Sequence, residues 1–200
     1  ALPISKPLSL YVHVPFCKAK CTYCDFYSII GRENSIPEYL KSILKEIEQK
    51  TRELDLSGHY LDTIFFGGGT PNLLEPNHLR QLLDMLLGLT QAGNEMEIGM
   101  EINPGEASLK NLIAYKAQGI NRVSIGMQSF QPHLLSFMSR IHSAEKSFST
   151  YDDVRKAGFQ NVSGDLIFAV PGQTRDECGQ DEREHGHNVS DGRHGTQHPI

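Results

Sequence analysis

Residues 11–26 read Tyr-Val-His-Val-Pro-Phe-Cys-Lys-Ala-Lys-Cys-Thr-Tyr-Cys-Asp-Phe. The cysteines of this segment are Cys17, Cys21 and Cys24, with the spacing C-x3-C-x2-C, and they follow an apolar run directly. Three thiolates this close in the chain can hold three corners of a four-iron, four-sulfur cluster and leave the fourth iron without a protein ligand. An open metal position is typical of a catalytic site rather than a structural one.

A structural zinc site is the alternative for the same cysteines, completed by His13 or by a group from elsewhere in the chain. Such sites usually pair a C-x2-C with a second, distant pair of ligands. The sequence has no second pair, because Cys178 is the only other cysteine. The residues therefore favour the cluster.

Composition narrows the class of protein. The chain has 200 residues, with 19 Lys and Arg against 24 Asp and Glu, so its net charge of −5 gives no support for a nucleic-acid partner. The apolar runs are too short for a transmembrane segment, and no secretory signal precedes the first strand. A single cysteine outside the cluster segment fits a reducing compartment. We therefore expect a cytoplasmic protein.

Apolar runs rich in β-formers alternate with amphipathic segments, which is typical of parallel strands joined by crossover helices. Strands are predicted at residues 8–15, 61–66, 96–102, 121–127 and 161–170. Helices are predicted at residues 36–54, 76–89, 109–118, 134–138 and 151–157. In the first strand, Tyr11 and His13 share one face, and Val12 and Val14 share the other. This order, with no hairpin signal, predicts an α/β fold with either a barrel-like or a doubly wound parallel sheet.

Distinctive polar residues follow four of the predicted strands or end them, and one, Asp165, lies within the fifth. Active sites of parallel α/β folds form at the carboxyl ends of the strands, where the connecting loops gather. The cysteines, a glycine run at residues 67–69, Glu101, Gln128 and Asp165 would all lie at this edge. Their convergence favours a curved, barrel-like sheet around one central site.

Each of these residues also has an ordinary structural interpretation. The glycine run could be a tight turn without a ligand, although its exposed backbone suits a ligand with amino and carboxylate groups. Glu101 could be a solvated strand end or could accept a hydrogen bond from a ligand ammonium group. Gln128 could bond to backbone, and Arg140 could end a helix in solvent. Asp165, within an apolar strand, needs a partner.

Several motifs, in order, resemble those of one family. They are Tyr11-x-His-x-Pro-Phe-Cys-x3-Cys-x-Tyr-Cys24, Phe66-Gly-Gly-Gly-Thr-Pro71, Glu101-x-Asn-Pro104, Asn121-Arg-x-Ser-Ile-Gly-x-Gln-Ser-Phe130 and Asp165-Leu-Ile-x-x-x-Pro-Gly-Gln-Thr174. Together they look like the radical S-adenosylmethionine (SAM) superfamily, and within it the oxygen-independent coproporphyrinogen III oxidase-like family. The resemblance implies a partial (βα)6 TIM-like barrel, here truncated after the fifth strand.

The resemblance also implies the cofactors. Cys17, Cys21 and Cys24 would ligate a [4Fe-4S] cluster whose open iron is chelated by SAM. The family's SAM contacts match Tyr11, Tyr23, Gly68, Gly69, Thr70, Glu101, Gln128, Arg140 and Asp165. One-electron reduction of SAM would then need an electron donor such as flavodoxin or ferredoxin, and the cofactor would carry the difficult chemistry.

One position distinguishes branches of that family. The oxidases usually have a further cysteine two residues after the third, where this sequence has Phe26. This departure resembles the haem-chaperone branch, so we expect a protein that binds and transfers haem. The alternatives are oxidative decarboxylation of coproporphyrinogen III by an oxidoreductase, and a non-catalytic module stabilised by metal. The haem-contact motif of the family is not found in this sequence.

Residues 175–200, here called the tail, differ in composition from residues 1–174. The tail is polar and holds four of the nine histidines, at positions 185, 187, 194 and 198. We expect residues 1–174 to form the radical SAM core as an incomplete barrel. The tail is expected to form neither a helix nor a strand, being disordered or the product of a truncated or shifted reading frame. A second metal site at its histidines is the alternative.

Overall fold

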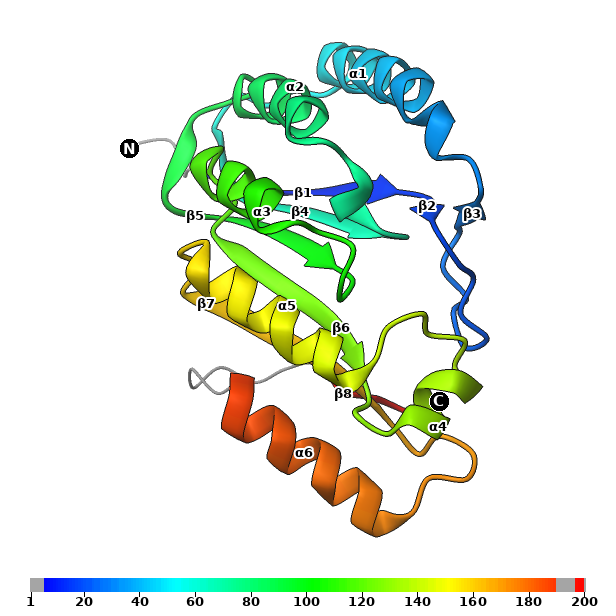
Figure 1. Ribbon diagram of the computed structural model, residues 1–200. Helices are drawn as coiled ribbons and strands as arrows, with labels where there is room; N and C mark the ends of the chain where they lie inside the picture. Colours follow the sequence, from blue (N-terminus) through cyan, green and yellow to red (C-terminus); the bar gives the residue numbers. More distant parts are fainter. Residues whose placement is uncertain (1–5, 190–196, 200) are drawn as a thin grey trace.

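The computed structural model describes residues 6–189 and 197–199, with side chains as far as residue 184. Its main feature is a parallel sheet of six strands in the order β1-β4-β5-β6-β7-β8 (Figure 1). The strands are β1 (Lys6–Val14), β4 (His59–Gly68), β5 (Ala92–Ile102), β6 (Arg122–Gln128), β7 (Asn161–Phe168) and β8 (Gln197–Pro199). The helices are α1 (Ile36–Glu53), α2 (Pro76–Leu87), α3 (Leu109–Ala117), α4 (Pro132–Phe137), α5 (Ala144–Lys156) and α6 (Arg175–Val189).

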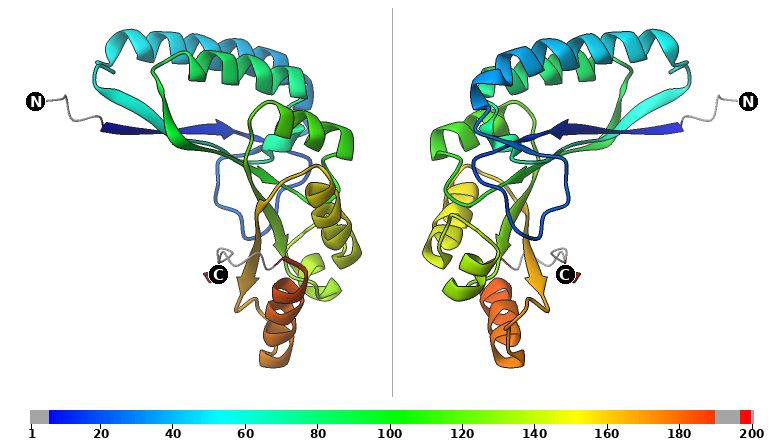
Figure 2. Two further views of the ribbon diagram at one scale, coloured as in Figure 1. Left: turned by 90° about the vertical axis from the view of Figure 1, so that its left-hand side faces the viewer. Right: turned by 90° about the vertical axis from the view of Figure 1, so that its right-hand side faces the viewer.

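The strand order decides between the two architectures that the sequence allowed. A doubly wound sheet reverses its strand order at a switch point and carries helices on both faces. Here the order in the sheet follows the order in the chain. Figure 2 shows the helices along the outer side of a curved sheet. The predicted partial barrel is therefore confirmed, but its expected truncation after the fifth strand was wrong, because β8 adds a sixth strand beside β7.

The two faces of the strands have opposite character. Val12 and Val14 of β1 are buried, whereas Tyr11 is 56% exposed, as the alternation in the sequence predicts. The outward face of the sheet packs on leucines and other apolar residues of the helices, including Leu79, Leu82, Leu83, Leu86, Leu112 and Val154. Burying this apolar area stabilises the fold and leaves the inner, concave face for polar side chains.

The first strand is followed by a loop that lies on the inner side of the sheet (Figure 2). A two-stranded parallel sheet, β2 (Phe16–Cys17) with β3 (Ile29–Ile30), closes this loop at its base. We call residues 17–28 the cysteine loop. At the far end, the Thr22 amide and hydroxyl donate to the carbonyls of Met138 and Phe137, at 3.3 and 3.0 Å. The loop is therefore held at both ends, which fixes the cysteines against the strand ends.

The expectation that the tail forms neither a helix nor a strand was wrong. Residues 175–189 form α6, and β8 pairs in parallel with β7. The signal missed was a capping box: the Thr174 hydroxyl accepts from the Glu177 amide at 3.2 Å, and the Glu177 carboxylate accepts from the Thr174 amide at 2.8 Å. The side chains of the tail histidines lie outside the described residues, and the division at residue 174 stays a prediction.

Asp181 anchors α6 to the sheet. Its side chain is 3% exposed and accepts hydrogen bonds from the Ser129 hydroxyl at 2.6 Å and the Phe130 amide at 3.0 Å. A third, from the Gln131 side-chain amide, measures 3.3 Å. These donors lie in the turn that follows β6. The buried carboxylate of Asp181 therefore has hydrogen-bond partners, and the donors of the turn have an acceptor that they would otherwise lack.

No helix within residues 6–189 or 197–199 combines the length and the apolar character needed to cross a bilayer.

Substituting Asp181 tests whether α6 belongs to the fold. Asp181→Ala should lower the free energy of unfolding by about 3 kcal/mol, because it removes charge-assisted bonds and leaves buried donors unpaired. Glu182→Ala, at the exposed neighbouring position, is the control and should change it by less than about 0.5 kcal/mol. Urea titration followed by circular dichroism measures both. Equal effects of the two variants would mean that α6 does not dock as described.

The end of β4 gives a second stability prediction. A Cβ atom at Gly69 would lie 2.6 Å from the Phe16 carbonyl oxygen and 2.9 Å from Cys17 Sγ, so Gly69→Ala forces the cysteine loop outward. We expect it to lower the free energy of unfolding by about 2 kcal/mol. At Gly88, the nearest atoms to an added Cβ are 3.4 Å away, and Gly88→Ala should be close to neutral. Urea unfolding of both variants measures the difference.

Candidate functional site

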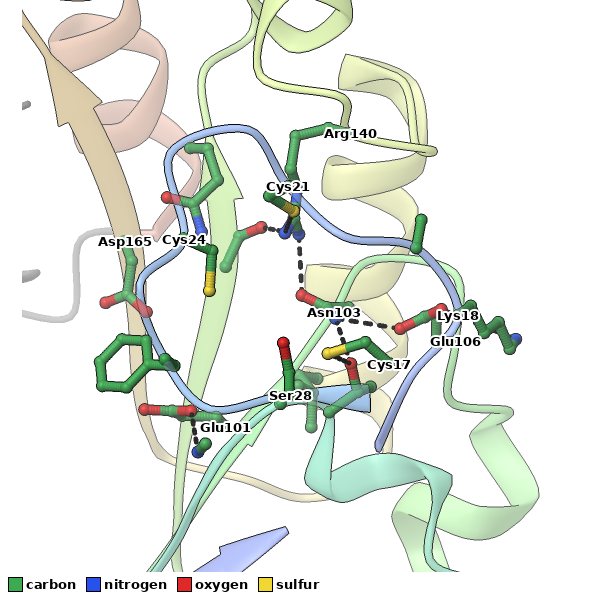
Figure 3. Close-up of a pocket in the computed structure, with 18 of the residues that line it drawn as sticks. Cys17, Lys18, Cys21, Cys24, Ser28, Glu101, Asn103, Glu106, Arg140 and Asp165 are labelled. Atoms are coloured by element: carbon green, nitrogen blue, oxygen red, sulfur yellow. Dashed lines mark hydrogen bonds and ion pairs between the residues drawn. The ribbon is translucent and has the colours of Figure 1, made fainter. Parts of the chain in front are cut away.

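A cavity of about 780 Å³ opens where the cysteine loop faces the carboxyl ends of the strands (Figure 3). Most of the predicted site residues line it: Cys17, Cys21, Tyr23, Cys24, Gly68, Gly69, Thr70, Glu101, Gln128, Arg140 and Asp165. They come from the loop, from the ends of four strands and from the segment after α4. The cysteines, Gly68, Gly69, Glu101, Gln128 and Asp165 thus lie around one cavity, as the sequence predicted, and of the residues assigned to SAM through the resemblance only Tyr11 lies outside its lining.

Tyr11 does not line this cavity. It lies on the inner face of β1, where its hydroxyl is 3.0 Å from His13 Nδ1 and its ring stacks on Phe65. His13 Nε2 is in turn 2.8 Å from the Tyr27 carbonyl oxygen. Tyr11 therefore supports the strand from which the cysteine loop departs, and its predicted contact with SAM stays a prediction.

The three cysteines of the loop are free thiols that differ in burial. Cys17, in β2, is buried, while Cys21 and Cys24 are partly exposed. Figure 3 shows the three side chains around the same part of the cavity. Burial raises the pKa of the Cys17 thiol, and a hydrogen bond from Thr70 opposes that rise. Among the described residues, no group of three or more His, Cys, Asp or Glu side chains is placed to hold a single metal ion.

Asn103 connects the two sides of the cavity, although the sequence singled it out only within the motif Glu101-x-Asn-Pro104. Its Nδ2 donates to Thr70 Oγ1 at 2.8 Å and to Glu106 Oε2 at 3.0 Å. Its Oδ1 accepts from Arg140 Nη2 at 2.8 Å. The Asn103 backbone amide is itself held by Asn72 Oδ1 at 3.0 Å. Because Asn72 is buried, this bond fixes the backbone of Asn103 to the interior of the protein.

Arg140 crosses the cavity wall toward the cysteine loop. Nη2 also donates to the Gly126 carbonyl at 2.9 Å, and Nη1 lies 3.4 Å from both Cys21 Sγ and the Tyr23 hydroxyl. The Arg140 Nε atom is buried without a hydrogen-bond partner. Burial raises the pKa of Tyr23 despite the nearby guanidinium, so the phenol stays protonated. Arg140 thus lines the cavity with both terminal nitrogens engaged, and its Nε is a buried donor without an acceptor.

Glu101 is a partly buried carboxylate on the inner face of β5. It accepts from the Gly68 amide at 3.2 Å. Burial, with a smaller contribution from Asp165, raises its pKa to about 7, against the lowering effect of the Gly68 bond. A carboxyl group in this state is poised to become ionised when a cation binds beside it.

Asp165 and Gln128 complete the opposite wall. Both Asp165 oxygens accept from the Ser124 hydroxyl at 2.9 Å, which supplies the partner that an apolar strand requires. Gln128 has a left-handed backbone with φ of 67°, which turns the chain at the end of β6. Close by, His142 Nε2 donates to the Met127 carbonyl at 3.1 Å, and burial lowers its pKa to about 4. His142 is thus neutral and held by the end of β6, at the lining of the cavity.

Comparison with known proteins gives the family. The model of the radical SAM superfamily matches residues 11–183. Among curated proteins, the chain is 37% identical over 170 residues to "Heme chaperone HemW" of Bacillus subtilis, covering 83% of this chain and 44% of that protein. It is 34% identical over 179 residues to the protein of the same name in Escherichia coli, covering 89% and 47%.

Among solved structures, coproporphyrinogen III oxidase (HemN) from Escherichia coli superposes with a TM-score of 0.84 at 30% identity, covering 94% of this chain and 43% of that one. The chain thus spans less than half the length of each of these relatives. Because the superfamily match extends from the first strand into α6, it includes the cysteine loop and every strand end that borders the cavity. The chain belongs to the radical SAM superfamily.

Proposed function

We propose that the cavity holds a [4Fe-4S] cluster on Cys17, Cys21 and Cys24, with SAM beside it. The observation that carries the proposal is the placement of these free thiols on one cavity with Glu101 and Arg140. SAM has an ammonium, a carboxylate and a sulfonium group, so it needs both acidic and basic partners. The positive charge of Arg140 at the cavity wall and the raised pKa of Glu101 fit such a ligand. When bound, the cluster and SAM supply one-electron chemistry.

The residues of the chain divide the binding between them. Arg140 is suited to the carboxylate of SAM, because a guanidinium pairs with carboxylates in a fixed geometry. Glu101 is suited to the positively charged ammonium and sulfonium groups of SAM. Gly68 and Gly69 lack side chains and so leave room for a ligand to approach the backbone. The remaining positions assigned through the family resemblance are Tyr11, Tyr23, Thr70, Gln128 and Asp165.

We further propose that the whole protein is a haem chaperone. The support is twofold: the curated relatives carry that name, and Phe26 stands where the oxidases have a fourth cysteine. Haem would then be the cargo, and an electron donor such as flavodoxin or ferredoxin would be the partner. A cytoplasmic location is part of the same proposal.

Coproporphyrinogen III oxidation is the second candidate, because the oxidase from Escherichia coli superposes closely. An anaerobic incubation with coproporphyrinogen III, SAM and a reductant separates the two. We expect the Soret band of added haem to shift and sharpen on binding to the protein, and no release of carbon dioxide from the porphyrinogen. Carbon dioxide together with new vinyl groups would favour the oxidase, and a metal-bound chain that binds neither SAM nor haem would favour the non-catalytic module.

Cysteine substitution tests the cluster. Cys17→Ser, Cys21→Ser and Cys24→Ser should each reduce iron incorporation by at least about tenfold, because losing a ligand costs more than losing an outer partner. Cys178→Ser, on α6, should incorporate iron like the unmodified chain. Iron and sulfide analysis after anaerobic reconstitution measures this, with electron paramagnetic resonance of the reduced protein. A full cluster in any of the first three variants would contradict the assignment.

The partly buried Glu101 predicts a dependence of stability on pH in the SAM-free protein. The unfolded chain loses this proton near pH 4.5 and the folded chain near pH 7, so the folded state binds more protons in between. The stability that Glu101 contributes therefore falls as the pH rises from about 4.5 to about 7, by up to about 3 kcal/mol.

Glu101→Gln removes this ionisation and should be more stable than the unmodified chain at pH 8, but not at pH 4.5. The same variant should bind SAM about tenfold more weakly, since a charge-assisted contact is lost. Urea unfolding at the two pH values and calorimetric SAM titration measure these effects. A variant that gains stability at pH 8 and binds SAM normally would remove Glu101 from the binding site.

A further inference from the structure

The orientation of the Asn103 amide is fixed by its neighbours. An arginine can only donate hydrogen bonds and a carboxylate can only accept them. The Asn103 oxygen must therefore face Arg140 Nη2, and its NH2 group must face Glu106 Oε2. Glu106 is held in turn, because its side chain is 4% exposed and lies 3.7 Å from Lys18 Nζ. With both partners of fixed polarity, the amide cannot flip without losing two bonds.

This orientation decides where the Thr70 hydroxyl points its hydrogen. Thr70 Oγ1 accepts from Asn103 Nδ2 at 2.8 Å, so its own hydrogen is free to donate. Cys17 Sγ lies 3.7 Å from Thr70 Oγ1, within the range of a hydrogen bond to sulfur. Thr70 is 1% exposed, so no solvent competes for that hydrogen. The hydroxyl is thereby aimed at the sulfur of Cys17.

Asn103 acts on a second sulfur through Arg140. The bonds from Nη2 to Asn103 Oδ1 and to the Gly126 carbonyl hold one side of the guanidinium. The other side then directs Nη1 toward Cys21 Sγ at 3.4 Å. Figure 3 shows Asn103 between Cys17 and Arg140. One amide thus orients a donor onto each of two cysteines.

We infer that Asn103 is a positioning residue that raises the reduction potential of the cluster by directing Thr70 and Arg140 onto the sulfurs of Cys17 and Cys21. Reduction adds negative charge to a cluster and to its ligand sulfurs. Donors aimed at those sulfurs stabilise the reduced form, and such hydrogen bonds tune cluster potentials. The inference rests on the proposed binding of the cluster by the three cysteines.

Ser28 provides an internal control for this arrangement. Its hydroxyl opposes the rise in the pKa of the Cys17 thiol, as Thr70 does. The Ser28 hydroxyl accepts from Lys20 Nζ at 2.9 Å and has no bond to Asn103, so its own hydrogen is available to Cys17 whatever stands at position 103. The effect of Ser28 on the potential should therefore be independent of residue 103.

The experiment measures the midpoint potential of the reconstituted, SAM-free chain by redox titration with electron paramagnetic resonance. Thr70→Val should lower the midpoint potential. At a fixed potential, the ratio of reduced to oxidised cluster should fall several-fold to tenfold, and a tenfold fall corresponds to about 59 mV for one electron. Thr70→Ser, which keeps the hydroxyl, should leave it unchanged. Ser28→Ala should lower it as well.

The decisive comparison uses Asn103→Asp, which still accepts from Arg140 but cannot donate to Thr70. The Thr70 hydroxyl should then donate to Asp instead of to Cys17, so adding Thr70→Val should cause no further fall. Adding Ser28→Ala should cause the same fall as in the unmodified chain. Because each effect is measured within one background, the added charge of the aspartate does not enter the comparison.

Full additivity of Thr70→Val and Asn103→Asp would overturn the inference, as would equal potentials for Thr70→Val and Thr70→Ser. If Asn103→Asp does not bind iron, the Thr70→Val and Thr70→Ser pair still decides whether the directed hydroxyl affects the potential. Absence of a cluster in the unmodified chain would instead refute the proposed cofactor, so the two failures are distinguishable.

Discussion

The close approach of the end of β4 to the cysteine loop is the constraint on which the site depends. The Gly69 amide donates to the Val14 carbonyl at 2.8 Å, while the position of its missing Cβ lies within 3 Å of Cys17 Sγ. Only a bare backbone allows β4 to bond to β1 and to contact the first cysteine at once. Cys17 is thereby fixed to the sheet, and Thr22 ties the outer part of the loop to the end of α4.

Polar groups on the inner face are held mostly in pairs that leave little freedom. Arg122 contacts Glu97 at 2.9 Å, Ser124 donates to Asp165, and Arg140 donates to Asn103. A partly buried polar group without a partner is costly, so each pair fixes the positions of both its members. Burial of the apolar outer face of the sheet stabilises the fold, and the paired side chains of the inner face fix the orientation of hydrogen-bond donors and acceptors around the cavity.

Much of this was predictable from the sequence, and the exceptions have physical reasons. Period-two alternation gave the faces of β1, and the motif order gave the convergence of Cys17, Glu101 and Arg140 on one cavity. The role of Asn103 depends on distances between segments far apart in the chain, which a single sequence does not contain. The failure to predict α6 has a different cause. The low apolar content of residues 175–189 argued against a helix, whereas the helix is stabilised by a local cap at Thr174 and by the buried side chain of Asp181.

The separation along the chain between the cysteine loop and its supports has a consequence for biosynthesis. Arg140 contacts Cys21 across 119 positions, so a ribosome exposes the three thiols well before the residues that orient them. At about 5–20 residues per second, that interval is on the order of ten seconds. The asparagine, the arginine and the helix anchor all emerge later than the metal ligands. Iron delivered before these residues emerge would meet a cysteine loop that lacks its supports. We therefore expect the cluster to assemble correctly only after the chain has been translated past Asp181.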